Sequence, residues 1–124
     1  MAIMQLLEDL YPNTAPMIPK DPFKKAQTLE ISDIVNSGIQ PLQNLSVILK
    51  ISDEPDKRAE WANFWISKGL SALEAVLTKS AGFYCVGDEV TIADACLFPQ
   101  AASASRYINT TCLISPKANK EKYT

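Results

Sequence analysis

The sequence predicts an all-α fold, a right-handed bundle of about four helices with a buried central helix at residues 91–106. Two observations support this prediction. Three stretches carry apolar residues at helical spacing, and a capping box opens a nearly uncharged apolar run. With 124 residues, of which 47% are hydrophobic, the chain has the length of one domain and can bury a real core.

The first helix is predicted over residues 1–11, which have an apolar stripe and no N-cap residue. The stripe consists of Ile3, Leu6, Leu7, Leu10 and Tyr11. A helix without a cap at Met1 suggests that something normally precedes it. Residues 12–21 then contain three prolines, which cannot sustain a helix, and they are interpreted as a linker.

A long helix is predicted to follow the linker. Asp21 and Pro22 are typical of a helix start, a capping acid followed by proline at the first helical position. An apolar stripe then continues to about Ile51. Pro41 interrupts this stripe, because proline lacks an amide and crowds the preceding turn, and Gly38 should assist the bend. We therefore expect one long helix that is kinked near Pro41.

The next helix is predicted to follow an acidic break at residues 52–56 and to run to about Ser80, where Gly82 ends it. Its polar residues fall in one narrow arc of the helical wheel, and apolar residues fill the opposite half. Trp61 and Trp65 lie in the apolar half. Both are expected in the core rather than at a ligand.

The central helix is predicted from the spacing of Thr91 and Asp94, a capping box in its Asp variant. We expect the Thr91 hydroxyl to accept from the Asp94 amide, and the Asp94 carboxylate to reach back to the Thr91 amide. Almost no charge follows up to Arg106, so the helix lacks a wide polar face. The other helices should pack around it.

Composition argues against several function classes. A net charge of -2 and a pI near 5.1 argue against binding to nucleic acid or to an anionic membrane surface. No apolar run suggests a membrane span or a signal peptide. Histidine is absent, which removes Ser-His and Cys-His nucleophiles and the usual zinc sites, so no metal site is predicted. Three cysteines without paired spacing favour a reduced, cytoplasmic setting.

Two segments resemble the cytosolic glutathione transferases. Residues 86–94 (Val-Gly-Asp-Glu-Val-Thr-Ile-Ala-Asp) resemble the loop and capping box that open the buried sixth helix of the all-helical domain in that superfamily. Residues 38–45 (Gly-Ile-Gln-Pro-Leu-Gln-Asn-Leu) are more specific and resemble the signature of the zeta class, which includes maleylacetoacetate isomerase. With residues 84–89 and 98–100, the similarity covers about residues 2 to 107.

The resemblance implies a function and a set of site residues. It implies glutathione as co-substrate, cis-trans isomerisation of maleylacetoacetate to fumarylacetoacetate in tyrosine and phenylalanine catabolism, conjugation of glutathione to α-halo acids, and a homodimer. It also implies that Gln40, Asn44, Leu45 and Ser46 bind glutathione and that Arg106 binds a carboxylate of the substrate. From the pattern alone, a solvated polar face for the first group and a helix-capping role for Arg106 stay open.

The resemblance also divides the chain. Residues 1–11 would end the helix that follows a thioredoxin-like domain, residues 12–21 would be the linker, residues 22–107 the helical domain, and residues 108–124 a divergent, disordered tail. The family holds the glutathione thiol with a serine-cysteine motif in the thioredoxin-like domain, upstream of Met1. The chain is therefore expected to be the substrate-side helical half, inactive alone and without a catalytic residue. The alternative is a non-catalytic protein-interaction module of the same fold.

Overall fold

The computed structural model describes residues 1–104, and every regular element in that range is helical, which confirms the predicted all-α class. The elements are α1 (Ala2–Leu10), α2 (Pro22–Asp33), the π-helical turn η1 (Ile34–Ile39), α3 (Gln40–Gln43), α4 (Leu45–Ile51), α5 (Pro55–Ser80) and α6 (Ile92–Ala104). Arg106 and the predicted tail lie outside the described residues. None of the helices in residues 1–104 combines the length and the apolar character needed to cross a bilayer.

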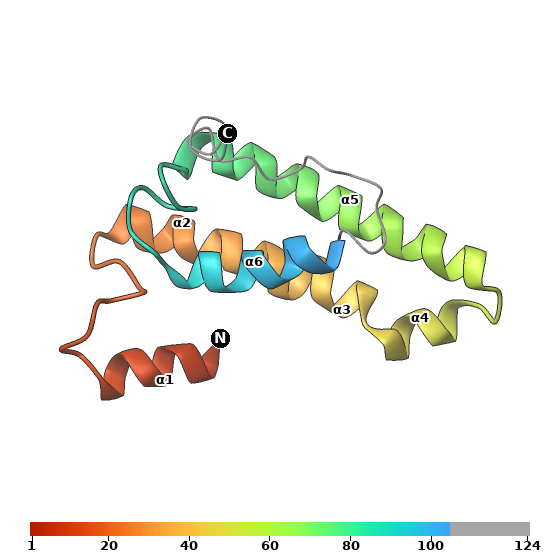
Figure 1. Cartoon of the computed structure of the whole chain (residues 1–124), viewed down its shortest axis with the longest axis horizontal. Helices are drawn as coiled ribbons and strands as arrows, with labels where there is room; N and C mark the ends of the chain where they lie inside the picture. The colour runs from red at the N-terminus through yellow and green to blue at the C-terminus, as the bar shows by residue number, and fades with distance from the viewer. Residues whose placement is uncertain (105–124) are drawn as a thin grey trace.

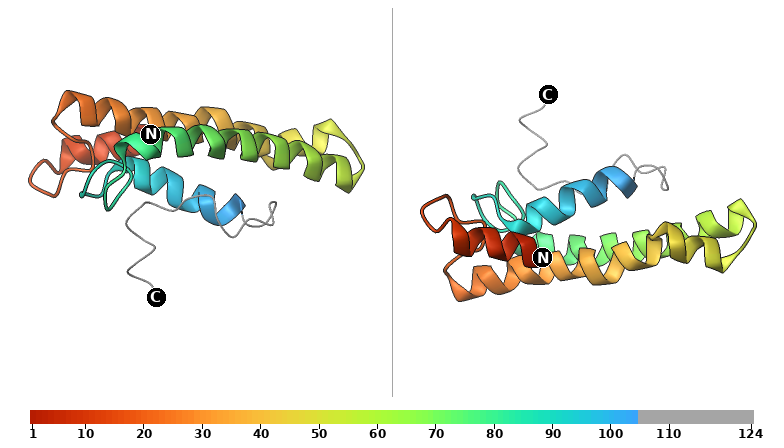
Figure 2. Two further views of the ribbon diagram at one scale, coloured as in Figure 1. Left: turned by 90° about the horizontal axis from the view of Figure 1, so that it is seen from above. Right: turned by 90° about the horizontal axis from the view of Figure 1, so that it is seen from below.

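Two long antiparallel arms make up the body of the fold. One arm is the succession α2, η1, α3 and α4, and the other is α5, which returns alongside it (Figure 1). Helix α6 lies against one side of this pair, as the two views of Figure 2 agree. Helix α1 lies at the end where α2 begins, and none of its residues is buried. The Ile92 amide, at the start of α6, donates to the Met17 carbonyl at 3.0 Å and ties the linker to the bundle.

The prediction of one helix from residue 22 to about residue 51 is wrong beyond Gln43. Asn44 has an extended backbone (φ -60°, ψ 136°), and its side chain accepts from the Ser46 amide at 3.0 Å. Asparagine is among the best N-cap residues, because its short side chain satisfies an amide that the first helical turn leaves free. The chain therefore ends one helix at Asn44 and starts another, α4.

The π-helical turn η1 lies in the first arm, shortly before Pro41. The Gln40 amide donates to the carbonyl of Val35, five residues earlier instead of four. Such a turn contains one extra residue, and it ends two residues before Pro41, which has no amide to donate to the ladder. The distortion of the arm is thus centred on residues 34–39 rather than on the proline itself.

The core fills the space between the two arms and the inner side of α6. Its members from the first arm and α5 include Ile31, Val35, Ile39, Ile66, Leu70 and Leu73. Trp61 packs against this cluster, and its indole nitrogen donates to the Leu42 carbonyl at 2.9 Å. Trp65 is only half-buried and meets Phe64 with 5.2 Å between ring centroids. Both tryptophans are partly buried and their ring centroids are 5.8 Å apart; Trp61 packs against the core, and Trp65 extends this aromatic contact to the exposed Phe64.

Helix α6 is buried along one side in the part of the chain that the structure describes. Its buried residues are Ile92, Ala93, Leu97, Gln100 and Ala104. Phe98 and Pro99 face away from the arms, and Phe98 is 79% exposed. The apolar residues that predicted a central helix thus also form a second face of α6, which no other residue among 1–104 covers.

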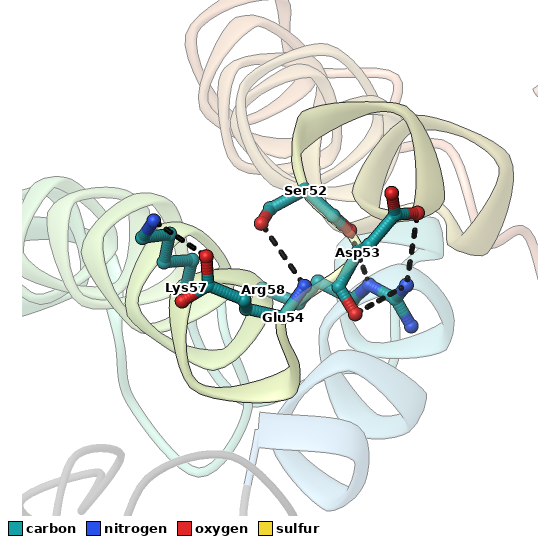
Figure 3. A network of polar contacts seen from close by, with 5 residues as sticks. All are labelled: Ser52, Asp53, Glu54, Lys57 and Arg58. Carbon is teal, nitrogen blue, oxygen red and sulfur yellow. Dashed lines mark hydrogen bonds and ion pairs between the residues drawn. The ribbon is translucent and has the colours of Figure 1, made fainter.

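The turn between α4 and α5 is closed by its own polar groups (Figure 3). Arg58 donates from Nε to the Ser52 carbonyl at 2.6 Å and from Nη2 to the Asp53 carbonyl at 3.1 Å. The Glu54 amide donates to the Ser52 hydroxyl at 3.1 Å, and Lys57 pairs with the Glu54 carboxylate at 2.8 Å. Carbonyls near a helix C-terminus lack intrahelical partners, so Arg58 stabilises the place where the chain reverses.

Candidate functional site

The four predicted glutathione-binding residues lie in one short stretch of the first arm. Gln40 is the first residue of α3, Asn44 separates α3 from α4, and Leu45 and Ser46 begin α4. All four are exposed, and Leu45 is 67% exposed. We call this group the α3–α4 wall. It presents neutral hydrogen-bonding groups beside one bare apolar side chain.

Asn44 and Ser46 are already bonded to each other. The Asn44 Oδ1 atom accepts from the Ser46 amide at 3.0 Å and from the Ser46 hydroxyl at 2.7 Å. Because capping requires an acceptor, this contact fixes which end of the Asn44 carboxamide is the oxygen. Its Nδ2 group is then the donor that Asn44 can offer to a ligand.

Gln40 is held from behind by a residue of α6. Its Nε2 atom lies 2.6 Å from Oε1 of Gln100, which is fully buried. Gln43 contacts the same carboxamide at both ends, at 2.9 and 3.1 Å. We call Gln40, Gln43 and Gln100 the glutamine cluster. Neither Gln43 nor Gln100 was among the predicted site residues, although a glutamine in the apolar run of α6 was a signal that could have found it.

Asp94 joins the start of α6 to the loop before it. Its carboxylate accepts from the Thr91 amide at 2.8 Å, from the Thr91 hydroxyl at 3.1 Å and from the Cys85 amide at 2.9 Å. The Asp94 amide donates to the Thr91 carbonyl at 3.1 Å. The expectation that the Thr91 hydroxyl accepts from this amide is therefore wrong. The hydroxyl instead donates to the carboxylate, which is the stronger acceptor.

The Cys85 thiol is not a nucleophile in this fold. Burial raises its pKa well above the ordinary value of a thiol, and the adjacent Asp94 raises it further. A thiol reacts as its thiolate, and this one stays protonated at neutral pH. Among residues 1–104 there is also no group of three or more side chains that could hold a metal ion. Cys85 is therefore a buried structural thiol rather than an activated nucleophile.

A surface hollow of about 350 Å³ lies away from the α3–α4 wall, between the linker, the start of α2 and the loop before α6. Its charged lining residues are Lys20, Asp21, Lys24, Asp88 and Glu89. These charges are of both signs. None of the predicted glutathione-binding residues lines it.

Comparison with known proteins gives a consistent set of relatives. Residues 42–120 match the family of the glutathione S-transferase C-terminal domain. The chain is 49% identical over 107 residues to probable maleylacetoacetate isomerase 2 of Drosophila melanogaster and to maleylacetoacetate isomerase of Mus musculus, covering 86% of this chain. It spans about half the length of these curated relatives, 46% and 48%.

The solved structures agree in fold. The maleylacetoacetate isomerase of Anaeromyxobacter dehalogenans 2CP-1, with glutathione bound in its active site, superposes with a TM-score of 0.80 at 39% identity. The match covers 86% of this chain and 50% of that one. The maleylpyruvate isomerase of Pseudomonas aeruginosa PAO1 superposes with a TM-score of 0.78 at 32% identity, covering 86% of this chain and 58% of that one.

Proposed function

The chain belongs to the glutathione S-transferase family, whose C-terminal domain it matches, and we propose that it forms the substrate-side half of a zeta-class maleylacetoacetate isomerase. The observation that supports this most is the 49% identity to two proteins of that name over 107 residues. In the complete enzyme, glutathione would be the co-substrate. The reaction would convert maleylacetoacetate to fumarylacetoacetate, with conjugation of α-halo acids as a second activity.

The α3–α4 wall supplies the glutathione contacts in this proposal. Gln40, Asn44 and Ser46 offer neutral donors and acceptors suited to a peptide backbone, and Leu45 offers an apolar surface. Each neutral hydrogen bond contributes only about 0.5–1.5 kcal/mol net. Such a wall orients one side of the tripeptide but does not ionise its thiol, because its four residues are all uncharged and a thiolate needs a nearby positive charge or a set of amide donors.

The chain alone is therefore expected to bind glutathione with millimolar affinity or weaker and to be inactive. A few neutral hydrogen bonds do not overcome the free energy lost when a flexible tripeptide is immobilised. Calorimetry with glutathione and an isomerase assay with maleylacetone on the purified chain measure both quantities. The Asn44→Ala variant is the matched control for the weak binding. Micromolar affinity, or turnover above the uncatalysed rate, would contradict the proposal that half of the site lies elsewhere.

Arg106 is proposed to bind a carboxylate of the dicarboxylic substrate, since a guanidinium forms two parallel hydrogen bonds with a carboxylate. In a complete two-domain version of the protein, Arg106→Ala should raise KM for maleylacetone about tenfold or more and leave glutathione affinity nearly unchanged. The control is Arg106→Lys, which keeps the charge and loses the paired geometry. Unchanged kinetics with a lower melting temperature would instead assign Arg106 to capping the end of α6.

A homodimer and a cytoplasmic location complete this proposal. The competing proposal, a non-catalytic interaction module, is favoured by one observation: α1 buries no residue and exposes its apolar stripe, including Ile3, Leu6 and Leu10. A module of that kind would bind its partner through α1. Substitutions in the α3–α4 wall would then leave partner binding unchanged, whereas the enzyme proposal requires them to weaken glutathione binding.

A further inference from the structure

Gln100 is the one polar residue on the buried side of α6, a helix that lies wholly within residues 92–104. The two residues before it, Phe98 and Pro99, are exposed, so the chain turns the amide inward and the apolar groups outward. A buried carboxamide is costly unless its donors and acceptors are paired. Both ends of the Gln100 side chain are paired, one with Gln40 and Gln43 and the other with Gln43.

The first arm brings its two glutamines to Gln100 together. Gln40 and Gln43 are three residues apart on α3, which places them on the same face of that helix. The π-helical turn η1 comes immediately before Gln40 and inserts one residue into the helical repeat. It therefore resets which face of α3 meets α6. π-Helical turns occur frequently at functional sites.

The contacts divide the cluster into two roles. Gln43 meets Gln100 through both ends of its carboxamide, whereas Gln40 meets it through one end only. The other end of the Gln40 carboxamide stays at the exposed surface of the α3–α4 wall. The oxygen and nitrogen of all three carboxamides could be exchanged together and the same contacts would form. In either assignment one end of the Gln40 carboxamide is bonded to Gln100 and the opposite end points away from it.

We propose that Gln100 is a positioning residue that, with Gln43, holds the Gln40 carboxamide in the orientation in which the wall binds glutathione. This inference rests on the proposed function. A free glutamine side chain has many rotamers, and ordering it on binding weakens affinity. Gln40 would be partly ordered before the ligand arrives, because one end of its side chain is bonded to the fully buried Gln100.

The test follows the Gln40 side-chain NH₂ resonances of the ¹⁵N-labelled full chain during a glutathione titration. In the parent chain these resonances should lie away from those of a free glutamine and should shift as glutathione is added. Gln100→Leu should move them to the free position and raise the Kd about threefold to tenfold. Gln100→Glu keeps the acceptor for the Gln40 and Gln43 amide groups but loses the donor to the Gln43 oxygen, so it should retain the Gln40 resonances near their parent positions while weakening the Gln43 contact. Gln43→Leu is a second variant at the edge of the cluster, where the fold is least at risk.

The outcomes separate this inference from the proposed function. Backbone amide spectra first establish that Gln100→Leu and Gln43→Leu are folded. If the parent binds glutathione and these two variants leave the Kd and the Gln40 resonances unchanged, the positioning role is overturned. If the parent shows no shift at glutathione concentrations up to about 100 mM, which covers the millimolar and weaker affinities expected of the wall, the proposed function of the wall is overturned, even where the Gln100 variants still release Gln40. A loss of affinity in Gln100→Leu with recovery in Gln100→Glu supports the positioning role.

Discussion

Gly69→Ala is expected to destabilise the fold by about 1–3 kcal/mol or more, because no space exists for a methyl group at this position. A Cβ built on Gly69 would lie 2.2 Å from Cγ1 and 2.6 Å from Cδ1 of Ile39. Ile39 is itself fully buried on η1, so its side chain cannot simply move aside. The glycine thus sets the distance between α5 and the π-helical turn, and alanine must push the two arms apart.

Gly38→Ala is the matched control for this experiment. Gly38 lies in η1, next to the crowded Ile39, yet nothing lies within 4 Å of the Cβ that alanine would add. The substitution should be neutral or should stabilise the fold by up to about 1 kcal/mol, because alanine loses less backbone entropy than glycine on folding. Urea denaturation followed by circular dichroism measures both variants. Equal midpoints for Gly69→Ala and Gly38→Ala would show that the arms are not in contact at Gly69.

Asp94→Ala is expected to cost about 2–4 kcal/mol, the sum of a lost helix cap and of buried amides left without an acceptor. The carboxylate accepts from the Thr91 amide and hydroxyl and from the Cys85 amide, so it fixes both the start of α6 and the loop before it. Thr91 and Cys85 are buried, so their amides would lose an acceptor in a place that solvent reaches poorly.

Asp88→Ala is the control for Asp94. Asp88 lies in the same loop and accepts from the Phe83 amide at 2.9 Å, but it is exposed. Water can take over that contact, so the expected loss is below about 1 kcal/mol. Thermal unfolding of the two variants against the parent chain gives the comparison. An Asp94→Ala chain that melts with the parent, or no earlier than Asp88→Ala, would show that α6 does not depend on this carboxylate.

The sequence alone determined the features that depend on neighbouring residues. Asp21 and Pro22 predicted a helix start, and α2 begins at Pro22 with the Asp21 side chain accepting from the Lys24 amide. The stripe after the acidic break predicted a helix ending near Ser80, and α5 ends there. The all-α class follows from these signals. Caps, prolines and helical stripes act over three or four residues, so their effect can be read along the chain.

The candidate site was predictable only in part. The resemblance selected the four residues of the α3–α4 wall, whose glutathione-binding role stays a prediction, and Arg106, which lies beyond the described residues. Gln43 was visible only as one of the polar residues around Pro41, and Gln100 was missed, since hydrophobic periodicity treats a buried glutamine as an interruption. Their pairing joins residues 57 and 60 positions apart. No spacing rule within one helix reports such a contact.

The tertiary structure decided where the long helix ends, which face of α6 is buried and how the wall is held. At Asn44 the chain can either continue the helix of the first arm or end it and cap a new helix. Local helix propensity differs little between these two conformations. What separates them is the packing of α4 against α5 and the closing of its turn by Arg58. Likewise, an apolar helix such as α6 can bury any face, and the face it does bury is the one where Gln100 finds two partners. A buried carboxamide costs too much free energy to be left unpaired.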